Sequence, residues 1–118
     1  MLKIAVGGCR YFEDYNVLQS YLDDLLSKTP DENIVVISGH CRGADMLAER
    51  YADQRGYGKR IINADWRRYG RAAGVRRNAE MVNEADVIVA FWDDKSRGTA
   101  SLIKFTEKSG KPLFVKRI

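Results

Sequence analysis

The stretch at residues 86–103, DVIVAFWDDKSRGTASLI, contains a strand, a polar loop and the start of a helix. Its first seven residues form an apolar run rich in β-branched and aromatic side chains, which is typical of a buried strand. A helix that starts directly after a strand is a common anion site, because its first N–H groups are unpaired and its dipole adds partial positive charge. We therefore expect a phosphate beside Gly98, which has no Cβ to block the backbone, with Ser96 or Thr99 bonding a phosphate oxygen. The alternative is that Ser96 is an ordinary N-cap.

Strands and helices alternate along the whole chain. Apolar runs predict the strands, and apolar positions at helical spacing predict the helices between them. The predicted strands cover residues 3–6, 34–37, 59–63, 86–92 and 111–115, and the predicted helices cover residues 14–28, 44–55, 75–85 and about 97–109. This alternation predicts an α/β fold: a single Rossmann-like, three-layer domain over residues 1–118, with a five-stranded parallel sheet between layers of helices.

Individual residues mark the ends of several elements. Asp14 is expected to cap the first helix and Pro30 to end it, while Gly56 is expected to end the second helix. Residues 64–74 are expected to be irregular. In the helix that follows, the residues expected to face the core are Val75, Ala79, Met81 and Val82.

Composition excludes several classes of protein. The chain has 118 residues, a net charge of +4 and 45% hydrophobic residues, which fits one globular domain. It has no apolar run that could span a membrane and no signal peptide, so we expect a cytoplasmic protein without a membrane partner. Cys9 and Cys41 form no CxxC pair, and only His40 is near in sequence, so we expect no metal, no cofactor and no disulfide.

Positive charge is concentrated in one short segment, whereas acidic residues such as Asp31 and Glu32 lie elsewhere. The segment contains Arg67, Arg68, Arg71, Arg76 and Arg77. Such local charge suits a phosphate-bearing partner, either a nucleotide or a nucleic acid. A basic pair in the first turn of a helix opposes the helix dipole unless an anion compensates it, which makes Arg77 a strong candidate for ligand binding. Asn78 and Glu80 are weaker candidates on the same face.

The remaining candidates follow the carboxyl ends of the predicted strands, where parallel sheets bind their ligands. Small residues, hydroxyls and arginines recur there, whereas chance would scatter them over both edges. The candidate ligand-binding residues are Gly8, Cys9, Arg10, Ser38, Gly39, Arg42, Gly43, Asp45, Asp65, Trp66, Arg77, Asn78, Ser96, Arg97, Gly98 and Thr99. Asp45 is either a favourable first-turn acid or a ribose or base contact. Trp66 either packs in the core or stacks on a base.

Six short motifs occur in order along nearly the whole chain. They are Gly8-Cys9-Arg10-Tyr11-Phe12-x-Asp14-Tyr15, Ser38-Gly39-x-x-Arg42-Gly43-Ala44-Asp45, Ala64-Asp65-Trp66, Tyr69-Gly70-x-Ala72-Ala73-Gly74, Arg77-Asn78-x-x-Met81 and Ser96-x-Gly98-Thr99. Together they resemble the YspA-like, cpYpsA-related branch of the SLOG superfamily, which includes the Lonely-guy phosphoribohydrolases and DNA-processing protein A. The resemblance implies a sheet in the order 3-2-1-4-5 and a nucleotide-derived ligand between the loops after the first and fourth strands. It also implies that Gly98 and Thr99 hold a phosphate, with Arg77 near the ribose or the phosphate.

Two departures from the family pattern bear on catalysis. The Lonely-guy enzymes carry a catalytic glutamate shortly after their Gly-Thr pair, whereas Ala100-Ser101-Leu102 follows here. A hydrolase would need another acid, and Asp45 and Glu80 are the catalytic candidates, with Asp93 as a further acid nearby. The family usually has serine at the position of Cys9, where a thiol beside arginines or a helix N-terminus would be more reactive.

These observations leave three functions open. The favoured function is a sensor or binding module for a nucleotide or nucleotide-derived ligand, because it needs the phosphate site and the arginines but no catalytic acid. The alternative is hydrolysis of the N-glycosidic bond of a nucleoside 5′-monophosphate. The third is binding of single-stranded DNA, for which the arginines at residues 67–77 offer charge and Trp66 and Tyr69 offer stacking. The resemblance also implies a homo-oligomer.

Overall fold

The computed structural model describes residues 1–29 and 33–118, which form a five-stranded parallel sheet flanked by helices. In chain order the elements are β1 (Leu2–Gly8), α1 (Tyr15–Leu26), β2 (Ile34–Ser38), α2 (Ala44–Arg55), β3 (Gly58–Ile61), α3 (Trp66–Tyr69), the 3-10 helix η1 (Gly70–Ala72), α4 (Ala73–Glu84), β4 (Val87–Trp92), α5 (Arg97–Ser109) and β5 (Leu113–Arg117). The strand order is β3-β2-β1-β4-β5, which confirms the predicted α/β fold and the order 3-2-1-4-5. None of the helices described is long and apolar enough to cross a membrane.

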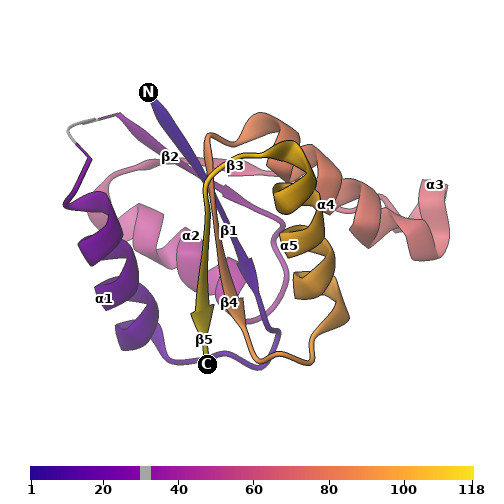
Figure 1. Ribbon diagram of the computed structural model, residues 1–118, viewed down its shortest axis with the longest axis horizontal. Helices are drawn as coiled ribbons and strands as arrows, with labels where there is room; N and C mark the ends of the chain where they lie inside the picture. Colours follow the sequence, from indigo (N-terminus) through magenta and orange to yellow (C-terminus); the bar gives the residue numbers. More distant parts are fainter. Residues whose placement is uncertain (30–32) are drawn as a thin grey trace.

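Helices α1 and α2 cover one face of the sheet, and α4 and α5 cover the other (Figure 1). Successive side chains of a strand point to opposite faces, so β1 contributes Ile4 and Val6 to the first core and Ala5 to the second. Leu18 and Leu22 of α1 pack against the first of these faces. The central strands are therefore buried on both sides, which explains why their apolar runs are unbroken.

The two central strands, β1 and β4, end side by side. Gly8 pairs with Phe91 in the register of the sheet, and the N–H of Cys9 donates a hydrogen bond to the Phe91 carbonyl oxygen at 3.0 Å. Gly43, with φ of +83°, starts α2 so close to this point that a Cβ there would overlap the carbonyl oxygen of Cys9. The loops after β1 and β4 and the start of α2 therefore meet at one edge of the sheet.

The helix ends predicted at Asp14 and Gly56 are confirmed. Asp14 caps α1 by accepting a hydrogen bond from a first-turn N–H at 3.2 Å. Gly56 ends α2 in the left-handed conformation, with φ of +71°. The helix end expected at Pro30 and the acidic residues Asp31 and Glu32 lie outside the described residues.

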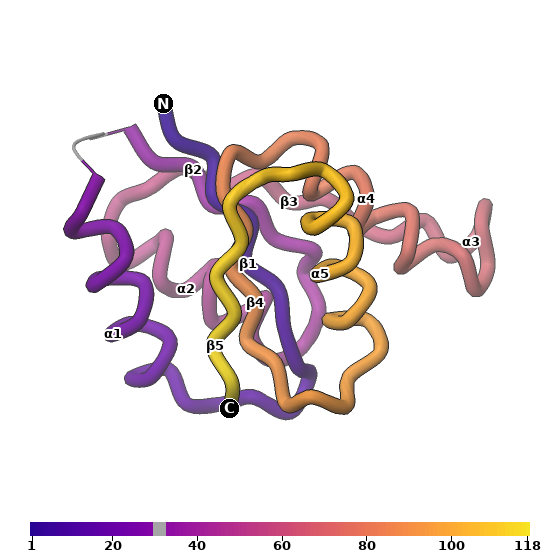
Figure 2. Tube along the Cα trace, in the orientation of Figure 1, coloured from indigo at the N-terminus to yellow at the C-terminus, as the bar shows by residue number. Residues whose placement is uncertain are grey.

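The expectation that residues 64–74 are irregular is wrong. They contain α3 and η1, and α4 begins at Ala73 rather than at residue 75. A four-residue helix is too short to show an apolar period, so the pattern could not reveal it. Val75 is 47% exposed instead of buried, although Ala73 in the same turn of α4 is buried, and this end of α4 leads out to α3 (Figure 2). Met81 and Val82, further along α4, are buried as expected.

Candidate functional site

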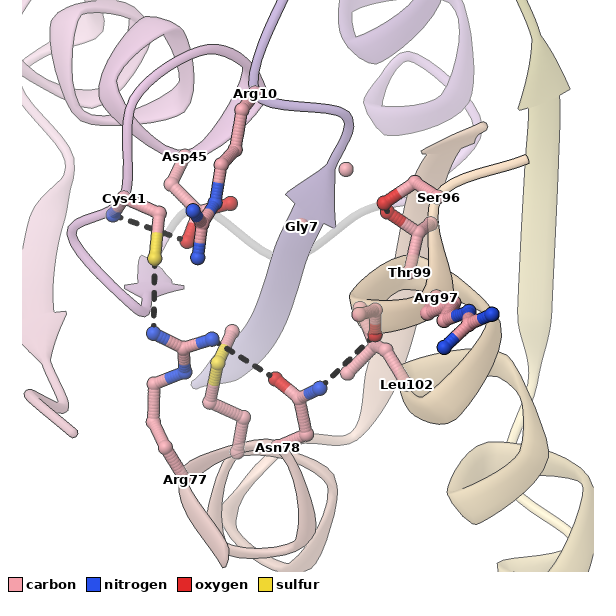
Figure 3. A pocket seen from close by; sticks show the side chains of 13 residues that line it. Gly7, Arg10, Cys41, Asp45, Arg77, Asn78, Ser96, Arg97, Thr99 and Leu102 are labelled. Carbon is pink, nitrogen blue, oxygen red and sulfur yellow. Dashed lines mark hydrogen bonds between the residues drawn. The ribbon is translucent and has the colours of Figure 1, made fainter. Parts of the chain in front are cut away.

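A pocket of about 260 Å³ lies at the carboxyl ends of β1 and β4 (Figure 3). We call it the edge pocket, and it is lined by Gly7, Gly8, Arg10, Cys41, Asp45, Arg77, Asn78, Met81, Ser96, Arg97, Gly98, Thr99 and Leu102. These residues come from the end of β1, the loop after it, the loop and first turn of α2, α4 and the start of α5. The edge pocket therefore lies at the point in a parallel sheet where strand order reverses, which is where such sheets bind ligands.

The first turn of α5 forms one wall of the edge pocket. Ser96 precedes this helix but makes no capping hydrogen bond to its backbone, and its Oγ instead accepts a hydrogen bond from Thr99 Oγ1 at 3.1 Å. A Cβ at Gly98 would meet no atom within 4 Å, so the backbone there faces open space. The first N–H groups of α5 therefore have no side-chain cap, which is the condition for holding an anion.

Asp93 holds the loop that leads into α5. Its Oδ1 accepts hydrogen bonds from the backbone N–H of Ser96 at 2.7 Å and of Lys95 at 2.9 Å, and these bonds lower the pKa of its carboxyl. Its Oδ2 accepts a hydrogen bond from the thiol of Cys9 at 3.4 Å. Cys9 is buried and fixes this loop, but it does not line the edge pocket.

Arg77 and Asn78 on α4 connect the other walls (Figure 3). The Asn78 amide donates to the carbonyl oxygen of Gly98 at 3.0 Å and so joins α4 to the first turn of α5. Arg77 Nη1 donates to the carbonyl oxygen of Gly39 at 3.3 Å and to Sγ of Cys41 at 2.9 Å. Within the described residues, Arg77 Nε is buried without a hydrogen-bond partner, a condition that native proteins rarely leave unexplained.

Asp45 lies in the first turn of α2, and its side chain is buried, with 5% exposure. Asp45 and Arg77 both lie against Gly39. A Cβ added to Gly39 would lie 2.8 Å from Cδ and Nε of Arg77 and 2.9 Å from Oδ2 of Asp45. Burial raises the pKa of Asp45 to about 6, and the Arg77 guanidinium and the Cys41 N–H, 3.4 Å from Oδ2, oppose part of this rise. A carboxyl with this pKa can hold or release a proton close to neutral pH.

Ser38 is fully buried and organises the loop that leads to Asp45, without lining the edge pocket. Its hydroxyl donates to Glu49 Oε2 at 2.8 Å and accepts a hydrogen bond from the His40 N–H at 3.1 Å. Glu49 Oε2 also lies 2.8 Å from His40 Nδ1. His40, with φ of +60°, is thereby held in a backbone conformation that non-glycine residues rarely adopt.

Ser38→Ala is expected to lower the free energy of unfolding by about 1–3 kcal/mol, because it removes one of the two side chains that contact the buried Glu49 carboxylate and takes away the acceptor of the His40 N–H. Urea denaturation measures this change. Ser20→Ala, at an exposed position of α1, is the matched control and should change stability by less than about 0.5 kcal/mol. Equal effects of the two substitutions would contradict a structural role for the Ser38 hydroxyl.

The described residues contain no group of three or more His, Cys, Asp or Glu side chains that could hold a metal ion. Cys9 and Cys41 are both free thiols. The polar groups that line the edge pocket include the first N–H groups of α5, the hydroxyls of Ser96 and Thr99, three arginines, Asn78, the Cys41 thiol and the Asp45 carboxyl.

Residues 2–69 match the family model described as the YspA, cpYpsA-related SLOG family. The matched residues are more than half of the chain. The chain belongs to this SLOG family. The Gene 61 protein of Mycobacterium phage D29 is a relative of this SLOG chain, with 36% identity over 119 residues that cover 96% of the chain and 94% of the phage protein.

Two solved structures share the SLOG fold. DNA processing protein A (DprA) from Streptococcus pneumoniae has a TM-score of 0.77 at 16% identity, and the match covers 98% of this chain and 50% of DprA. The chain therefore spans half the length of that protein. TM1055, a structural genomics target, has a TM-score of 0.66 at 22% identity, with 96% of this chain and 72% of TM1055 covered. At these identities the likeness shows the fold alone.

The SLOG fold brings most of the predicted ligand-binding residues to the edge pocket. Those that line it are Gly8, Arg10, Asp45, Arg77, Asn78, Ser96, Arg97, Gly98 and Thr99. Those that do not line it are Cys9, Ser38, Gly39, Arg42, Gly43, Asp65 and Trp66, together with the catalytic candidate Glu80. Asp65 and Trp66 belong to the α3 segment, and Arg42 and Glu80 are exposed.

Four lining residues were not among the predicted ones: Gly7, Cys41, Met81 and Leu102. Met81 follows Arg77 by four residues on α4, and Leu102 follows Gly98 by four residues on α5. Helical spacing from the predicted residues could therefore have located both. Nothing in the sequence distinguishes Cys41 from any other small residue in a loop after a strand.

The reason for choosing Arg77 needs correction. Because α4 begins at Ala73, Arg76 and Arg77 are its fourth and fifth residues rather than members of its first turn. The helix dipole acts mainly within the first turn, so it does not make these two cations strongly unfavourable. Arg77 lines the edge pocket because α4 places it opposite the carbonyl oxygen of Gly39.

Proposed function

We propose that this protein binds a nucleotide or a nucleotide-derived molecule in the edge pocket and acts as a sensor or binding module. The observation that carries the proposal is the first turn of α5, which has no side-chain cap and faces open space at Gly98. Arg10 and Arg97 line the same pocket. A phosphate fits this arrangement, because the N–H groups, the helix dipole and the arginines all favour negative charge. Ser96 and Thr99 offer hydroxyls to the same phosphate.

The side of the pocket formed by Asp45 and Arg77 is proposed to contact the sugar or the base. A carboxylate accepts hydrogen bonds from ribose hydroxyls, and the unpartnered Arg77 Nε is a donor for an oxygen or ring nitrogen of the ligand. A volume of about 260 Å³ is small for a ligand pocket, which favours a mononucleotide over a dinucleotide. Membership of the SLOG family also favours a nucleotide-related ligand.

A second candidate function is hydrolysis of the N-glycosidic bond of a nucleoside 5′-monophosphate. The specific observation in its favour is Asp45, a buried carboxyl in the edge pocket whose pKa is raised to about 6. Such a group is suited to proton transfer near neutral pH. Glu80, the other catalytic candidate, is exposed and does not line the pocket, so Asp45 is the residue on which this function depends.

Native mass spectrometry tests both functions after the protein is mixed with nucleoside mono- and diphosphates, cyclic nucleotides and dinucleotides. An adduct at the mass of an intact nucleotide supports the sensor and identifies its ligand. An adduct at the mass of ribose 5-phosphate, with free base in solution, supports the hydrolase. No adduct and no free base in any mixture would contradict both. The same spectra report whether the protein is the homo-oligomer that we propose.

A further inference from the structure

Residues 65–76, which we call the arm, comprise α3, η1 and the first residues of α4. The arm projects from the side of the molecule, beyond the layer formed by α4 and α5 (Figure 1, Figure 2). None of the residues of α3 is buried. Trp66, the large apolar side chain of this helix, is 54% exposed and does not line the edge pocket. The arm is therefore a surface separate from the pocket.

Local contacts hold the arm in shape. Asp65 caps α3 by accepting a hydrogen bond from the Arg68 N–H at 3.1 Å. The Trp66 ring rests beside the first turn of α4, where a Cβ at Gly74 would lie 3.5 Å from it. Two guanidinium groups lie over the Tyr69 ring, that of Arg76 at 4.1 Å and that of Arg68 at 5.1 Å from the ring centroid. A partner would thus meet a preformed surface.

The arm holds most of the net charge of the protein. Its four arginines and one aspartate give +3, whereas the whole chain carries +4. Arg67, Arg68, Arg71 and Arg76 are exposed, and within the part of the chain that the structure describes none of them forms an ion pair. Other exposed arginines do have acidic partners, as Arg60 has in Glu84. Unpaired like charges held close together repel one another, so an anionic partner would stabilise the arm.

We propose that the arm binds single-stranded nucleic acid, with its arginines on the phosphates and a base stacked on Trp66. Exposed arginines combined with an aromatic ring are the features by which proteins hold single strands. In a duplex the faces of the bases are already stacked, so an exposed indole favours a single strand. This proposal does not depend on the ligand of the edge pocket.

Fluorescence anisotropy with a labelled oligothymidylate of about 15 nucleotides tests the proposal. Replacing Arg67, Arg68 and Arg71 together by Glu is expected to weaken binding at least about a hundredfold and to reduce the slope of log K against log salt by about 2. Trp66→Ala is expected to weaken binding about tenfold with the salt slope unchanged, because stacking releases no counterions. The two variants thus separate charge from stacking.

The matched control replaces Lys28, Lys104 and Lys108 by Glu, which makes the same change of net charge at exposed positions outside the arm. It should retain most of the binding. An equal loss in this control would overturn the proposal in favour of net charge alone, and full binding by Trp66→Ala would overturn the stacking. Equally tight binding of a duplex, or equal competition by polyglutamate, would also overturn it.

Substitutions in the two sites distinguish this proposal from the proposed function. Gly98→Asp is expected to keep oligonucleotide binding while losing the mononucleotide. The triple arginine variant of the arm is expected to keep the mononucleotide while losing the oligonucleotide. If Gly98→Asp abolished oligonucleotide binding and the arm variant did not, the single strand would bind in the edge pocket and the proposal for the arm would be wrong.

Discussion

Gly98→Asp is expected to weaken nucleotide binding at least about a hundredfold without unfolding the protein, which corresponds to a loss of about 2.7 kcal/mol. The new carboxylate would occupy the open space at Gly98, where the phosphate is proposed to lie. Two like charges about 4 Å apart repel by about 4 kcal/mol at the effective dielectric of a protein surface, which exceeds the required loss. An aspartate in the first turn of a helix is favourable for the helix itself, so stability should not fall.

Two variants control this measurement, which is made by isothermal titration calorimetry with the nucleotide found by mass spectrometry. Asn83→Asp adds the same charge near the C-terminal end of α4, at a residue that does not line the edge pocket, and should leave binding unchanged. Gly98→Ala adds only a Cβ, which meets no atom of the protein within 4 Å, and should weaken binding far less than the aspartate does. Normal binding by Gly98→Asp, together with an unchanged thermal transition, would locate the ligand elsewhere.

The parallel sheet was predictable because helices cover both faces of the central strands, and burial on both faces leaves continuous apolar runs in the sequence. Asp14 and Gly56 were predictable because capping depends on atoms within one helical turn. The α3 segment was not predictable, because its contacts are irregular. Trp66 rests beside Gly74, and Tyr69 lies under two arginines, and neither contact produces a period in the sequence.

A residue that directly follows a parallel strand lies at the carboxyl edge of the sheet, and to that extent the candidate site was predictable from the sequence. This reasoning found Arg10 and Gly98, which follow the neighbouring strands β1 and β4. It included Trp66 among the candidates because Trp66 follows β3, but β3 is the outermost strand, two places from β1. The approach of Asp45 and Arg77 was not predictable, because their helices cover opposite faces of the sheet and meet only at its edge.

Asp45→Asn is expected to stabilise the folded protein by up to about 3 kcal/mol at about pH 8 and to have little effect at about pH 4. The pKa of Asp45 rises from 3.8 to about 6 on folding, so the folded state favours the neutral carboxyl. Its contribution to stability is fully present below about pH 4 and is lost as the pH rises through about 6, where the buried group ionises. Asparagine stays neutral at every pH and avoids this loss.

Urea denaturation of both proteins at about pH 4, 6 and 8 measures the difference, and all other titrating groups cancel in the comparison. Asp24→Asn, which removes an exposed carboxylate on α1, should shift stability by less than about 0.5 kcal/mol at each pH. A difference for Asp45→Asn that did not grow with pH would show that the carboxyl is not desolvated. A group that costs stability at neutral pH is one that a pocket retains for its chemistry, so the variant that is more stable should also bind or turn over the nucleotide less well.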